Sequence, residues 1–298
     1  MAIGIVAEYN PFHNGHIRQL EWIKANYPGE KIIVVMTDKF TQRGEYSVCS
    51  FRCRKKIAKH YGVQKVLKLK FEQTVQAAHV FAENAVLALA SQKVDKIVFG
   101  SESNDVENMI NTAKILRDRK DEFDQIIRPL IKKEKLSYPK AFALALEKMC
   151  GYSWAMPNDI LGFEYVKAII NNNLDIQPIS LQRNLAFHAT EPMGKFASAS
   201  YLRELIKNGD DISLYTPMTI KKARRIEQKY SRFIKILTTT PLNKLRKIPL
   251  VTEGIENLLI KNASEPTYAH FVNACVSKRY TASRIKRIIA WILCKKWK

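Results

Sequence analysis

The chain has 298 residues, a formal charge of +21 and a hydrophobic content of 46%. That hydrophobic content excludes a disordered chain, and the length suits one large domain or two ordinary ones. No apolar run approaches the roughly 20 residues that span a bilayer, and no signal peptide is visible, so we expect a cytoplasmic protein without membrane contact. Five scattered cysteines do not indicate a disulfide framework. Cys49 and Cys53 are four apart, but no second close Cys/His pair completes a zinc site, so we expect no protein-bound metal.

The basic excess is concentrated at one end of the chain. Residues 220–298 hold 19 Lys and Arg against four acidic residues, a net charge of +15. Such an excess favours a polyanionic partner, nucleic acid before membrane. The alternative is an ordinary solvated basic surface. No protein partner is indicated.

In chain order, the first feature is an apolar run at residues 3–7 that predicts a buried strand. Asn10 and Pro11 interrupt it, and an amphipathic run from Ile17 to Asn26 predicts a helix. His13 and His16 therefore lie where a strand turns into a helix, and unpaired N–H groups at a helix N-terminus favour phosphate. The glycine between the histidines, at position 15, would let a nucleotide approach the backbone closely.

These residues form an H-x-G-H motif and so resemble the nucleotidyltransferase superfamily, which also includes class I aminoacyl-tRNA synthetases. The resemblance implies that ATP binds here, and that His13 and His16 stabilise charge on its phosphates during attack at the α-phosphorus. The alternative is that two histidines merely cap a helix. The order of strand, proline break, motif and helix favours the nucleotide.

Further strands are predicted at residues 31–36, 63–69, 96–102 and 176–181, and helices at 50–61 and 76–92, with Ser50 as a possible N-cap. This alternation indicates βαβ units and a parallel sheet. The predicted fold class is therefore α/β, a Rossmann-like parallel-sheet nucleotidyltransferase domain of the HUP type, followed by a basic α-helical C-terminal domain. We place the catalytic domain at residues 1–210 and the helical domain at 211–298.

Several loops are candidates for ligand contacts because they follow parallel strands. Arg43, next to Gln42, could hold a carboxylate or phosphate in a fork, although an ordinary surface loop is the alternative. The turn at Gly100, Ser101 and Glu102 suits a nucleotide, but the signal is weak. Residues 109–148 are predicted as helices, and a further helix is predicted over 163–171.

Two more helix starts carry polar side chains. Asn158 or Asp159 could cap the helix predicted from residue 163. Ser198 and Ser200 precede a helix predicted from residue 201, and Arg203 follows one turn in. Hydroxyls and an arginine at a helix start make a second candidate phosphate site, with helix capping as the alternative.

After residue 214 no strand is predicted. A strongly basic helix is expected over 221–236, and another short helix runs to Lys261. In the last predicted helix, isoleucines at 285, 288, 289 and 292 share one face. Arg284, Lys286 and Arg287 lie off that face and would form a basic rim, to which a phosphate backbone could bind in a salt-sensitive way.

Six segments together resemble the bacterial tRNA(Met) cytidine acetate ligases, from the first strand to the last helix. The nine-residue motif at 8–16 is far more specific than H-x-G-H alone. The segments are Glu8-Tyr9-Asn10-Pro11-Phe12-His13-Asn14-Gly15-His16, Gln42-Arg43-Gly44-Glu45, Phe99-Gly100-Ser101-Glu102, Pro157-Asn158-Asp159-Ile160-Leu161-Gly162, Ser198-Ala199-Ser200 with Arg203, and Lys278-Arg279-Tyr280 with Arg284 and Arg287.

The resemblance implies a two-step reaction. Acetate attacks the α-phosphorus of ATP to give acetyl-adenylate and pyrophosphate, and the N4 amine of the wobble cytidine of elongator tRNA(Met) then takes the acetyl group. Mg²⁺ on the phosphates is expected from phosphoryl-transfer chemistry. The catalytic set would be His13, His16, Ser198, Ser200 and Arg203. ATP contacts would come from Ile5, Val6, Ala7, Glu8, Tyr9, Asn10, Pro11, Phe12, His13, Asn14, Gly15 and His16, and from Gly100, Ser101, Glu102, Asn158 and Arg183. Substrate contacts would come from Gln42, Arg43, Lys278, Arg279, Arg284 and Arg287.

The chain departs from the family pattern at a few positions. Thr37-Asp38 stands where the family usually has Ser-Gly, and Asp38 would put a negative charge near the expected acetate site. Asp159 replaces a family asparagine, and the chain is shorter than typical members. Two other functions stay open: a small-molecule nucleotidyltransferase that adenylylates a cofactor precursor, and a degenerate module that only binds tRNA.

Overall fold

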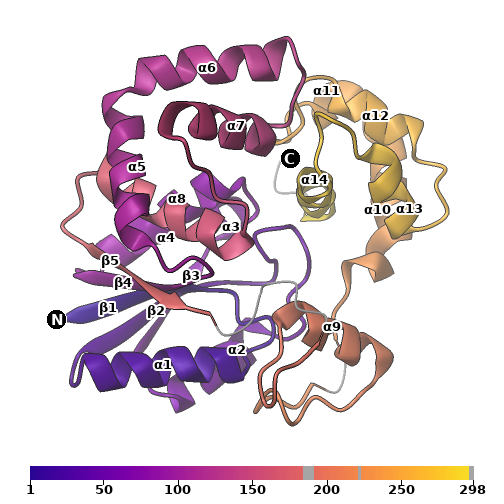
Figure 1. Cartoon of the computed structure of the whole chain (residues 1–298). Helices are drawn as coiled ribbons and strands as arrows, with labels where there is room; N and C mark the ends of the chain where they lie inside the picture. The colour runs from indigo at the N-terminus through magenta and orange to yellow at the C-terminus, as the bar shows by residue number, and fades with distance from the viewer. Residues whose placement is uncertain (184–190, 221–222, 295–298) are drawn as a thin grey trace.

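The computed structural model describes residues 1–183, 191–220 and 223–294. Five parallel strands form one sheet in the order β3-β2-β1-β4-β5, so the predicted α/β fold is confirmed (Figure 1). The strands are β1 (Ala2–Ala7), β2 (Lys31–Thr37), β3 (Lys65–Leu69), β4 (Lys96–Ser101) and β5 (Gln177–Gln182).

In the described residues one or more helices separate each strand from the next up to β5, and only helices follow β5. They are α1 (Asn14–Asn26), α2 (Phe51–His60), α3 (Phe71–Thr74), α4 (Ala78–Ala90), α5 (Val106–Asp118), α6 (Lys120–Lys132), α7 (Tyr138–Cys150), α8 (Pro157–Asn171), α9 (Ala199–Asn208), a 3₁₀ turn (Ile226–Lys229), α10 (Tyr230–Thr239), α11 (Leu242–Leu245), α12 (Ile255–Lys261), α13 (Tyr268–Cys275) and α14 (Ala282–Cys294). None of these helices has the length and apolar character needed to cross a membrane.

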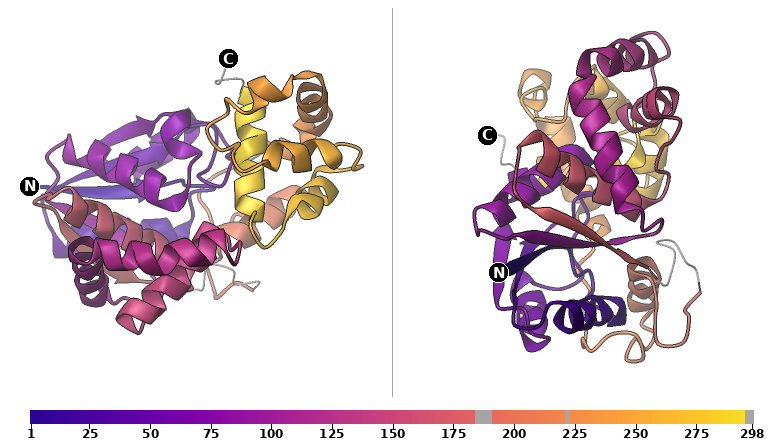
Figure 2. Two further views of the ribbon diagram at one scale, coloured as in Figure 1. Left: turned by 90° about the horizontal axis from the view of Figure 1, so that it is seen from above. Right: turned by 60° about the vertical axis from the view of Figure 1, so that its left-hand side comes forward.

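The sheet is covered on both faces (Figures 1 and 2). Helices α4 to α8 pack on one face through apolar residues such as Phe81, Leu89 and Val166. Helices α1 and α2 pack on the other through residues such as Leu20 and Ala58. Burial on both sides explains the unbroken apolar run of β2, because a strand between two layers of helices has no solvent face.

The strand order places a topological switch point between β1 and β4. From β1 the chain winds outward through β2 to β3, whereas β4 lies on the other side of β1 and leads to β5. In such sheets ligands bind in the crevice outside the carboxyl ends of the strands at this point.

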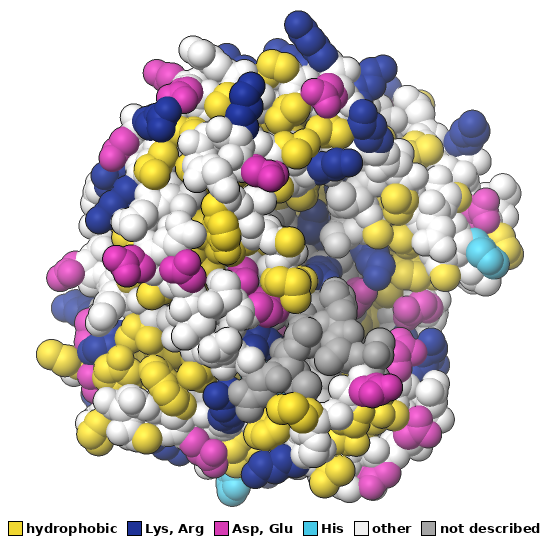
Figure 3. Space-filling model, in the orientation of Figure 1, with side chains coloured by type: hydrophobic (Ala, Val, Ile, Leu, Met, Phe, Trp, Pro, Cys, Tyr) yellow, Lys and Arg dark blue, Asp and Glu magenta, His cyan; other side chains and the backbone are white. Residues whose placement is uncertain are grey.

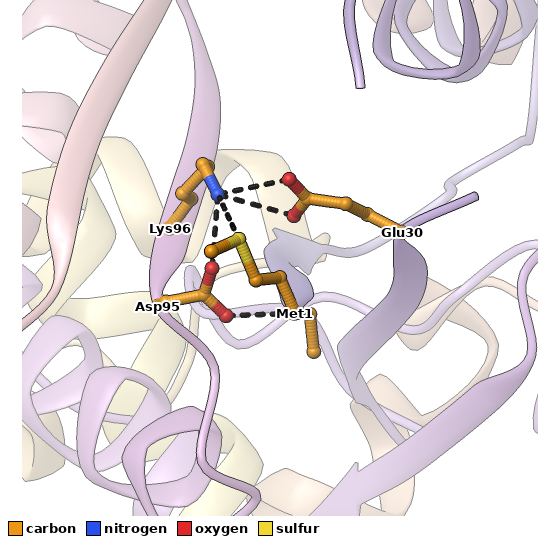
Figure 4. Close-up of polar contacts among 5 residues, drawn as sticks. Met1, Glu30, Asp95 and Lys96 are labelled. Atoms are coloured by element: carbon orange, nitrogen blue, oxygen red, sulfur yellow. Dashed lines mark hydrogen bonds and ion pairs between the residues drawn. The ribbon is translucent and has the colours of Figure 1, made fainter. Parts of the chain in front are cut away.

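A charged cluster closes the opposite, amino-terminal edge of the sheet (Figure 4). Lys96 Nζ lies 3.0 Å from Glu30 and 2.9 Å from Asp95, and Asp95 accepts a hydrogen bond of 2.7 Å from the Ala2 N–H. The cluster joins the starts of β1, β2 and β4 and is separate from the carboxyl edge.

The C-terminal helices α10 to α14 gather beside the sheet, with α14 innermost (Figures 1 and 2). The predicted isoleucine stripe of α14 is confirmed, because Ile285, Ile288, Ile289 and Ile292 are all buried. Trp291 on the same helix donates a buried hydrogen bond of 2.9 Å to the Val75 carbonyl, near α3. The helical region is thus joined to the sheet region through a buried contact.

The chain stays with the sheet region beyond residue 210. The Asn14 N–H donates to the Tyr215 carbonyl at 2.9 Å, and the Thr216 hydroxyl donates to the Phe12 carbonyl at 2.5 Å. Met218 lies in the cluster under α1 and α2. The division at residue 210 stays a prediction, and these contacts favour a boundary near residue 220.

Several helix ends differ from the sequence predictions. Helix α8 begins at Pro157, six residues early, so Asn158 and Asp159 lie inside its first turn and Met156 is its N-cap; the capping prediction for them was wrong. The helix expected over 221–236 is also wrong in its first part, since α10 begins only at Tyr230 after a short 3₁₀ turn. Lys221 and Lys222 lie outside the described residues.

Gly44, in the loop after β2, lies directly against the backbone of α14. It has a φ of +85°, and a Cβ there would lie 2.6 Å from the Lys286 carbonyl oxygen and 2.8 Å from the Arg287 Cα. Backbone cannot move aside as a side-chain end can, so only glycine allows α14 to pack here.

Gly44→Ala should therefore lower the free energy of unfolding by about 1–3 kcal/mol more than Gly29→Ala, measured by urea denaturation. Gly29 is the matched control because its φ is +80° and its Cβ would meet nothing within 4 Å. Equal losses in both variants would show that the contact with α14 does not restrain position 44.

Candidate active site

A cavity of about 460 Å³ opens at the carboxyl ends of the strands, at the switch point. Helix α9 and Lys286 of α14 close its other sides. The space-filling view is hollowed between the two groups of helices, and Lys and Arg side chains lie in and around that hollow (Figure 3). Of the catalytic, ATP-contacting and substrate-contacting residues predicted from sequence, those that line the cavity are Val6, Ala7, Glu8, Tyr9, Asn10, His13, Gly15, His16, Gln42, Arg43, Gly100, Asn158, Arg183, Ser200 and Arg203.

The remaining sequence candidates lie outside the cavity lining. Ile5 and Phe12 are in the core beneath it. Ser198 and Ser101 are buried and hydrogen-bonded to the protein itself. The full set outside the lining is Ile5, Pro11, Phe12, Asn14, Ser101, Glu102, Ser198, Lys278, Arg279, Arg284 and Arg287.

The two histidines both cap α1 and face the cavity. Helix capping and phosphate binding, the two interpretations of the motif, are therefore compatible. His13 is the N-cap, and its Nδ1 accepts a hydrogen bond of 3.1 Å from the Gly15 N–H. His16 Nδ1 accepts one of 3.1 Å from the His13 N–H. A neutral imidazole that accepts at Nδ1 carries its proton at Nε2. Each ring therefore presents an Nε2–H donor for a phosphate.

Burial keeps both rings neutral. Burial, together with the nearby Arg183 and Arg203 charges, lowers the pKa of His13 to about 3. Burial, His13 and Arg183 hold the pKa of His16 well below its ordinary value. The site thus offers two neutral donors beside permanent arginine charges, so its positive potential does not depend on imidazole protonation.

Gly15 has a packing role that the sequence analysis did not foresee. A Cβ at this position would lie 2.9 Å from the His13 Cε1 and 3.0 Å from its Nδ1. The rings of His13 and His16 stack with centroids 3.8 Å apart. The missing side chain therefore makes room for the capping ring, besides leaving the backbone open.

Helix α9 supplies a second set of polar groups. Ser198 is its N-cap and accepts a hydrogen bond from the Tyr201 N–H at 3.1 Å, which confirms the capping alternative for this serine. Ser200 and Arg203 line the cavity. Arg203 donates to the Asn10 carbonyl at 3.0 Å and to the Ser200 hydroxyl at 3.2 Å. Arg203 thereby joins α9 to the motif loop.

The turn after β4 is locked to the start of α8. Asp159 Oδ1 accepts hydrogen bonds from the Ser101 hydroxyl at 2.5 Å and the Glu102 N–H at 2.9 Å. In return Glu102 accepts from the Asp159 N–H at 3.0 Å and from the Asn158 side chain. This exchange explains why Ser101 and Glu102 lie outside the lining while Gly100 and Asn158 face the cavity. The Asp159 carboxylate, a departure from the family pattern, therefore has hydrogen-bond donors within the protein.

Asp38 does not put its charge at the cavity, so that expectation was wrong. Its carboxylate lies 3.4 Å from Lys68 Nζ at the surface, and it is absent from the cavity lining. The Asp38 carbonyl instead accepts a hydrogen bond from Arg54.

Arg54 is a functional-site residue that sequence reasoning missed. It is fully buried on α2 and donates to the carbonyls of Glu8 and Asp38, which follow β1 and β2. The sequence showed only a basic helix, in which nothing distinguishes this arginine from its neighbours. The buried guanidinium fixes the two strand ends from which the cavity loops begin.

Lys286 is the second residue that was missed as part of the site. It lies on α14, lines the cavity, and donates to Glu45 at 2.7 Å. The sequence placed it on a solvent-facing basic rim, but α14 packs against the loop at Gly44 and turns this side chain inward. Burial alone would raise the pKa of Glu45, but the Lys286 charge and hydrogen bond hold it below its ordinary value.

The predicted basic rim of α14 is therefore only partly available to a ligand. Arg284 donates to Glu253 at 2.9 Å and to Thr252 at 2.7 Å. Arg287 is half-buried with its Nε enclosed, and burial lowers its pKa to about 10. Lys278, before this helix, is exposed.

The family model for HIGH Nucleotidyl Transferases matches residues 1–298. The chain is 48% identical to the tRNA(Met) cytidine acetate ligase of Mycoplasmopsis synoviae, over 99% of this chain and 97% of that relative. The chain belongs to the tRNA(Met) cytidine acetate ligase family. It is also 35% identical to the ligase of a Geobacillus species, over 98% of this chain but only 78% of that longer relative.

Solved structures of the same family share the fold. The chain matches Thermotoga maritima TmcAL without ligand at a TM-score of 0.90 and 29% identity, over 98% of this chain and 75% of that one. It matches TmcAL bound with alpha-thio ATP at a TM-score of 0.87 and 28% identity, over 99% of this chain and 75% of that one. The predicted family and the nucleotidyltransferase-type fold are confirmed.

The lowered histidine pKa values predict a specific pH dependence of stability in the absence of nucleotide. Unfolded imidazoles protonate near pH 6.5, whereas folded His13 stays neutral down to about pH 3. The unfolded state therefore binds more protons as pH falls from 6.5 toward 3, and stability is lost in that window. His13 accounts for a loss of about 2 kcal/mol between pH 7 and pH 5.

His13→Asn keeps a side chain that caps a helix well. In urea denaturation at pH 5, 6 and 7, the variant should lose about 2 kcal/mol less unfolding free energy between pH 7 and pH 5 than the parent protein. At pH 8 the imidazole is neutral in both the folded and the unfolded state. The difference in unfolding free energy between the two proteins at that pH therefore measures the packing and capping that the imidazole alone provides. Parallel curves for the variant and the parent protein would contradict a neutral, buried His13.

Proposed function

We propose that this chain is an ATP-dependent tRNA(Met) cytidine acetate ligase of the cytoplasm, with ATP, acetate and elongator tRNA(Met) as substrates. The observation that carries the proposal is the convergence, in one cavity at the switch point, of the His13 and His16 donors with Arg183, Ser200 and Arg203. The relatives named for this activity support it, as does the ligand of the alpha-thio ATP complex.

In the first step the acetate oxygen attacks the α-phosphorus of ATP, forming acetyl-adenylate and releasing pyrophosphate. The Nε2–H groups of His13 and His16 would stabilise the charge that develops on the α-phosphate and on the leaving pyrophosphate. Ser200 and Arg203 would hold the β- and γ-phosphates. Because acetate is itself the nucleophile, the protein contributes mainly positioning and electrostatics. Ser198 would act through α9, as its cap.

The nucleoside would lie toward β4 and β5. Gly100, Asn158 and Arg183 line that side of the cavity, and the small residue at 100 leaves space beside the Arg183 side chain. In the first loop, Val6, Ala7, Tyr9 and Gly15 would touch ATP. Ile5, Pro11, Phe12 and Asn14 would hold the loop in shape.

Mg²⁺ would arrive on the ATP phosphates. Among the described residues no group of three or more His, Cys, Asp or Glu could hold a metal ion, whereas Arg183 and Arg203 line the cavity beside the histidines. The bound ion would neutralise charge on pyrophosphate as it leaves.

In the second step the tRNA anticodon would reach the cavity along the basic helical region. Lys278 and Arg279 would contact the tRNA backbone directly. Arg287 and Arg284 would contribute charge from the edge where α14 meets the sheet region, and Gln42 and Arg43 would contact the substrates inside the cavity.

The function is tested by incubating the protein with α-labelled ATP, Mg²⁺ and labelled acetate, before and after adding total tRNA. We expect acetate-dependent acetyl-adenylate, followed by label on a tRNA cytidine. His16→Asn should abolish adenylate formation, since it removes a donor to the α-phosphate, while leaving the affinity for tRNA nearly intact. Turnover without acetate dependence would favour a small-molecule nucleotidyltransferase, and tRNA binding without ATP binding would favour a degenerate module.

Lys278→Ala together with Arg279→Ala should weaken tRNA binding and reduce the slope of log K against log salt by about 2, measured by filter binding over a salt series. Lys56→Ala with Lys59→Ala removes the same charge from two exposed lysines of α2, on the face of the sheet covered by α1 and α2, and is the control, for which we expect a smaller loss. Equal losses in both pairs would place the RNA surface elsewhere.

A further inference from the structure

Two carboxylates line the cavity, and their surroundings differ. The Glu45 carboxylate lines the cavity and lies 2.7 Å from Lys286 Nζ. This ion pair lowers the pKa of Glu45 and so keeps its carboxylate ionised. Within residues 1–183, 191–220 and 223–294 no lysine forms an ion pair with Glu8. Carboxylates in one site whose environments separate their pKa values commonly have different roles. The family resemblance implies an ATP contact for Glu8 and leaves its role in the second half-reaction open.

One oxygen of Glu8 is held and the other faces the cavity. Oε1 accepts a hydrogen bond of 2.7 Å from the Gln42 N–H. The described residues make no hydrogen bond to Oε2, and Glu8 lines the cavity, so this oxygen is available to a ligand bound there. Arg54 fixes the backbone by donating to the Glu8 carbonyl. The second oxygen is thus presented on a rigid support.

The charged and titratable neighbours of Glu8 come from several elements. Burial raises the pKa of Glu8, and the charges of Arg203 on α9, Arg43 in the β2 loop and Arg54 on α2 act against that rise. Tyr165 on α8 is near enough to feel the Glu8 charge. A carboxyl with a raised pKa is a stronger base than an ordinary surface carboxyl.

Glu8 lies on the β2 side of the switch point. Its neighbours there are the loop residues Gln42 and Arg43, whereas Gly100 and Arg183 belong to the β4 and β5 side, where the nucleoside would lie. The β2 side is therefore left for the second reactant.

Resting on the proposed function, we propose that Glu8 Oε2 recognises the exocyclic N4 amino group of the acceptor cytosine and acts as the general base of acetyl transfer. Glu and Asp carboxylates are the side chains that accept hydrogen bonds from this amino group. A cytosine amine is a weak nucleophile because its lone pair is delocalised into the ring, so proton removal during attack helps the reaction.

Atoms and electrons balance in this step. The N4 nitrogen attacks the carbonyl carbon of acetyl-adenylate and a C–N bond forms. The bond between that carbon and the phosphate oxygen breaks, and AMP leaves with the electron pair. One N4 proton passes to Glu8 Oε2 and then to solvent, so no oxidant or further reactant is needed.

The test separates the two half-reactions in Glu8→Gln, which preserves an oxygen acceptor for the Gln42 N–H. Acetate-dependent ATP–pyrophosphate exchange should persist at a reduced rate, because Glu8 is also an expected ATP contact, and this remaining exchange shows that the variant is folded. Single-turnover transfer of acetyl from adenylate to tRNA should fall by about 10²-fold or more. The parent protein should show transfer that rises with pH through one apparent pKa, and this dependence should vanish in the variant.

Glu8→Asp should recover part of the transfer rate and its pH dependence, whereas Glu45→Gln should keep the pH dependence of the parent protein even if its rates fall. Parent-level transfer in Glu8→Gln would show that Glu8 only supports the β2 loop, and equal loss of both half-reactions would assign Glu8 to adenylation. Either result overturns the inference with the proposed function intact. Absence of acetate-dependent exchange in the parent protein would overturn both.

Discussion

The site depends on a buried arginine that holds two strand ends together. Arg54 reaches from α2 to the carbonyls that follow β1 and β2, and it is fully buried there. A buried guanidinium is tolerated when its hydrogen bonds satisfy groups that would otherwise be unpaired. The β1 loop carries Glu8 and the histidine motif, and the β2 loop carries Gln42 and Arg43. One side chain therefore sets the spacing between the phosphate groups and the second-reactant groups.

The helical region completes the cavity as well as adding charge beside it. Helix α14 packs on Gly44, places Lys286 at the cavity next to Glu45, and inserts Trp291 against Val75. Some of the basic side chains that would attract RNA, such as Lys286, thereby pair with groups of the protein itself. This arrangement couples the proposed tRNA-binding region to the loop that holds Glu8, since the Gln42 N–H bonds to the Glu8 carboxylate.

Much of the fold followed from local sequence pattern. The strands β1, β2 and β4 were predictable because each contains a short apolar, β-branched run, and the alternation of strands and helices placed the more polar β3 and β5. The His13 motif was predictable because its proline break and glycine mark a strand-to-helix turn. The start of α8 was missed because Pro157 at the first helical position looks like a loop signal. Arg54, Lys286 and Asp38 were misread for another reason. Burial or pairing of a charged residue depends on tertiary packing, which leaves no trace in its immediate neighbours.

In the proposed reaction one cavity holds the nucleotide toward β4 and β5 and the acyl and acceptor groups toward β2. The decisive experiment is a crystal structure of the protein with a stable acetyl-adenylate analogue, such as the acyl sulfamate. We expect adenosine beside Gly100 and Arg183, the phosphate surrogate at His13 and His16, and the acetyl group pointing toward Glu8. An acetyl group directed away from Glu8, or adenosine bound beside Gln42, would contradict it.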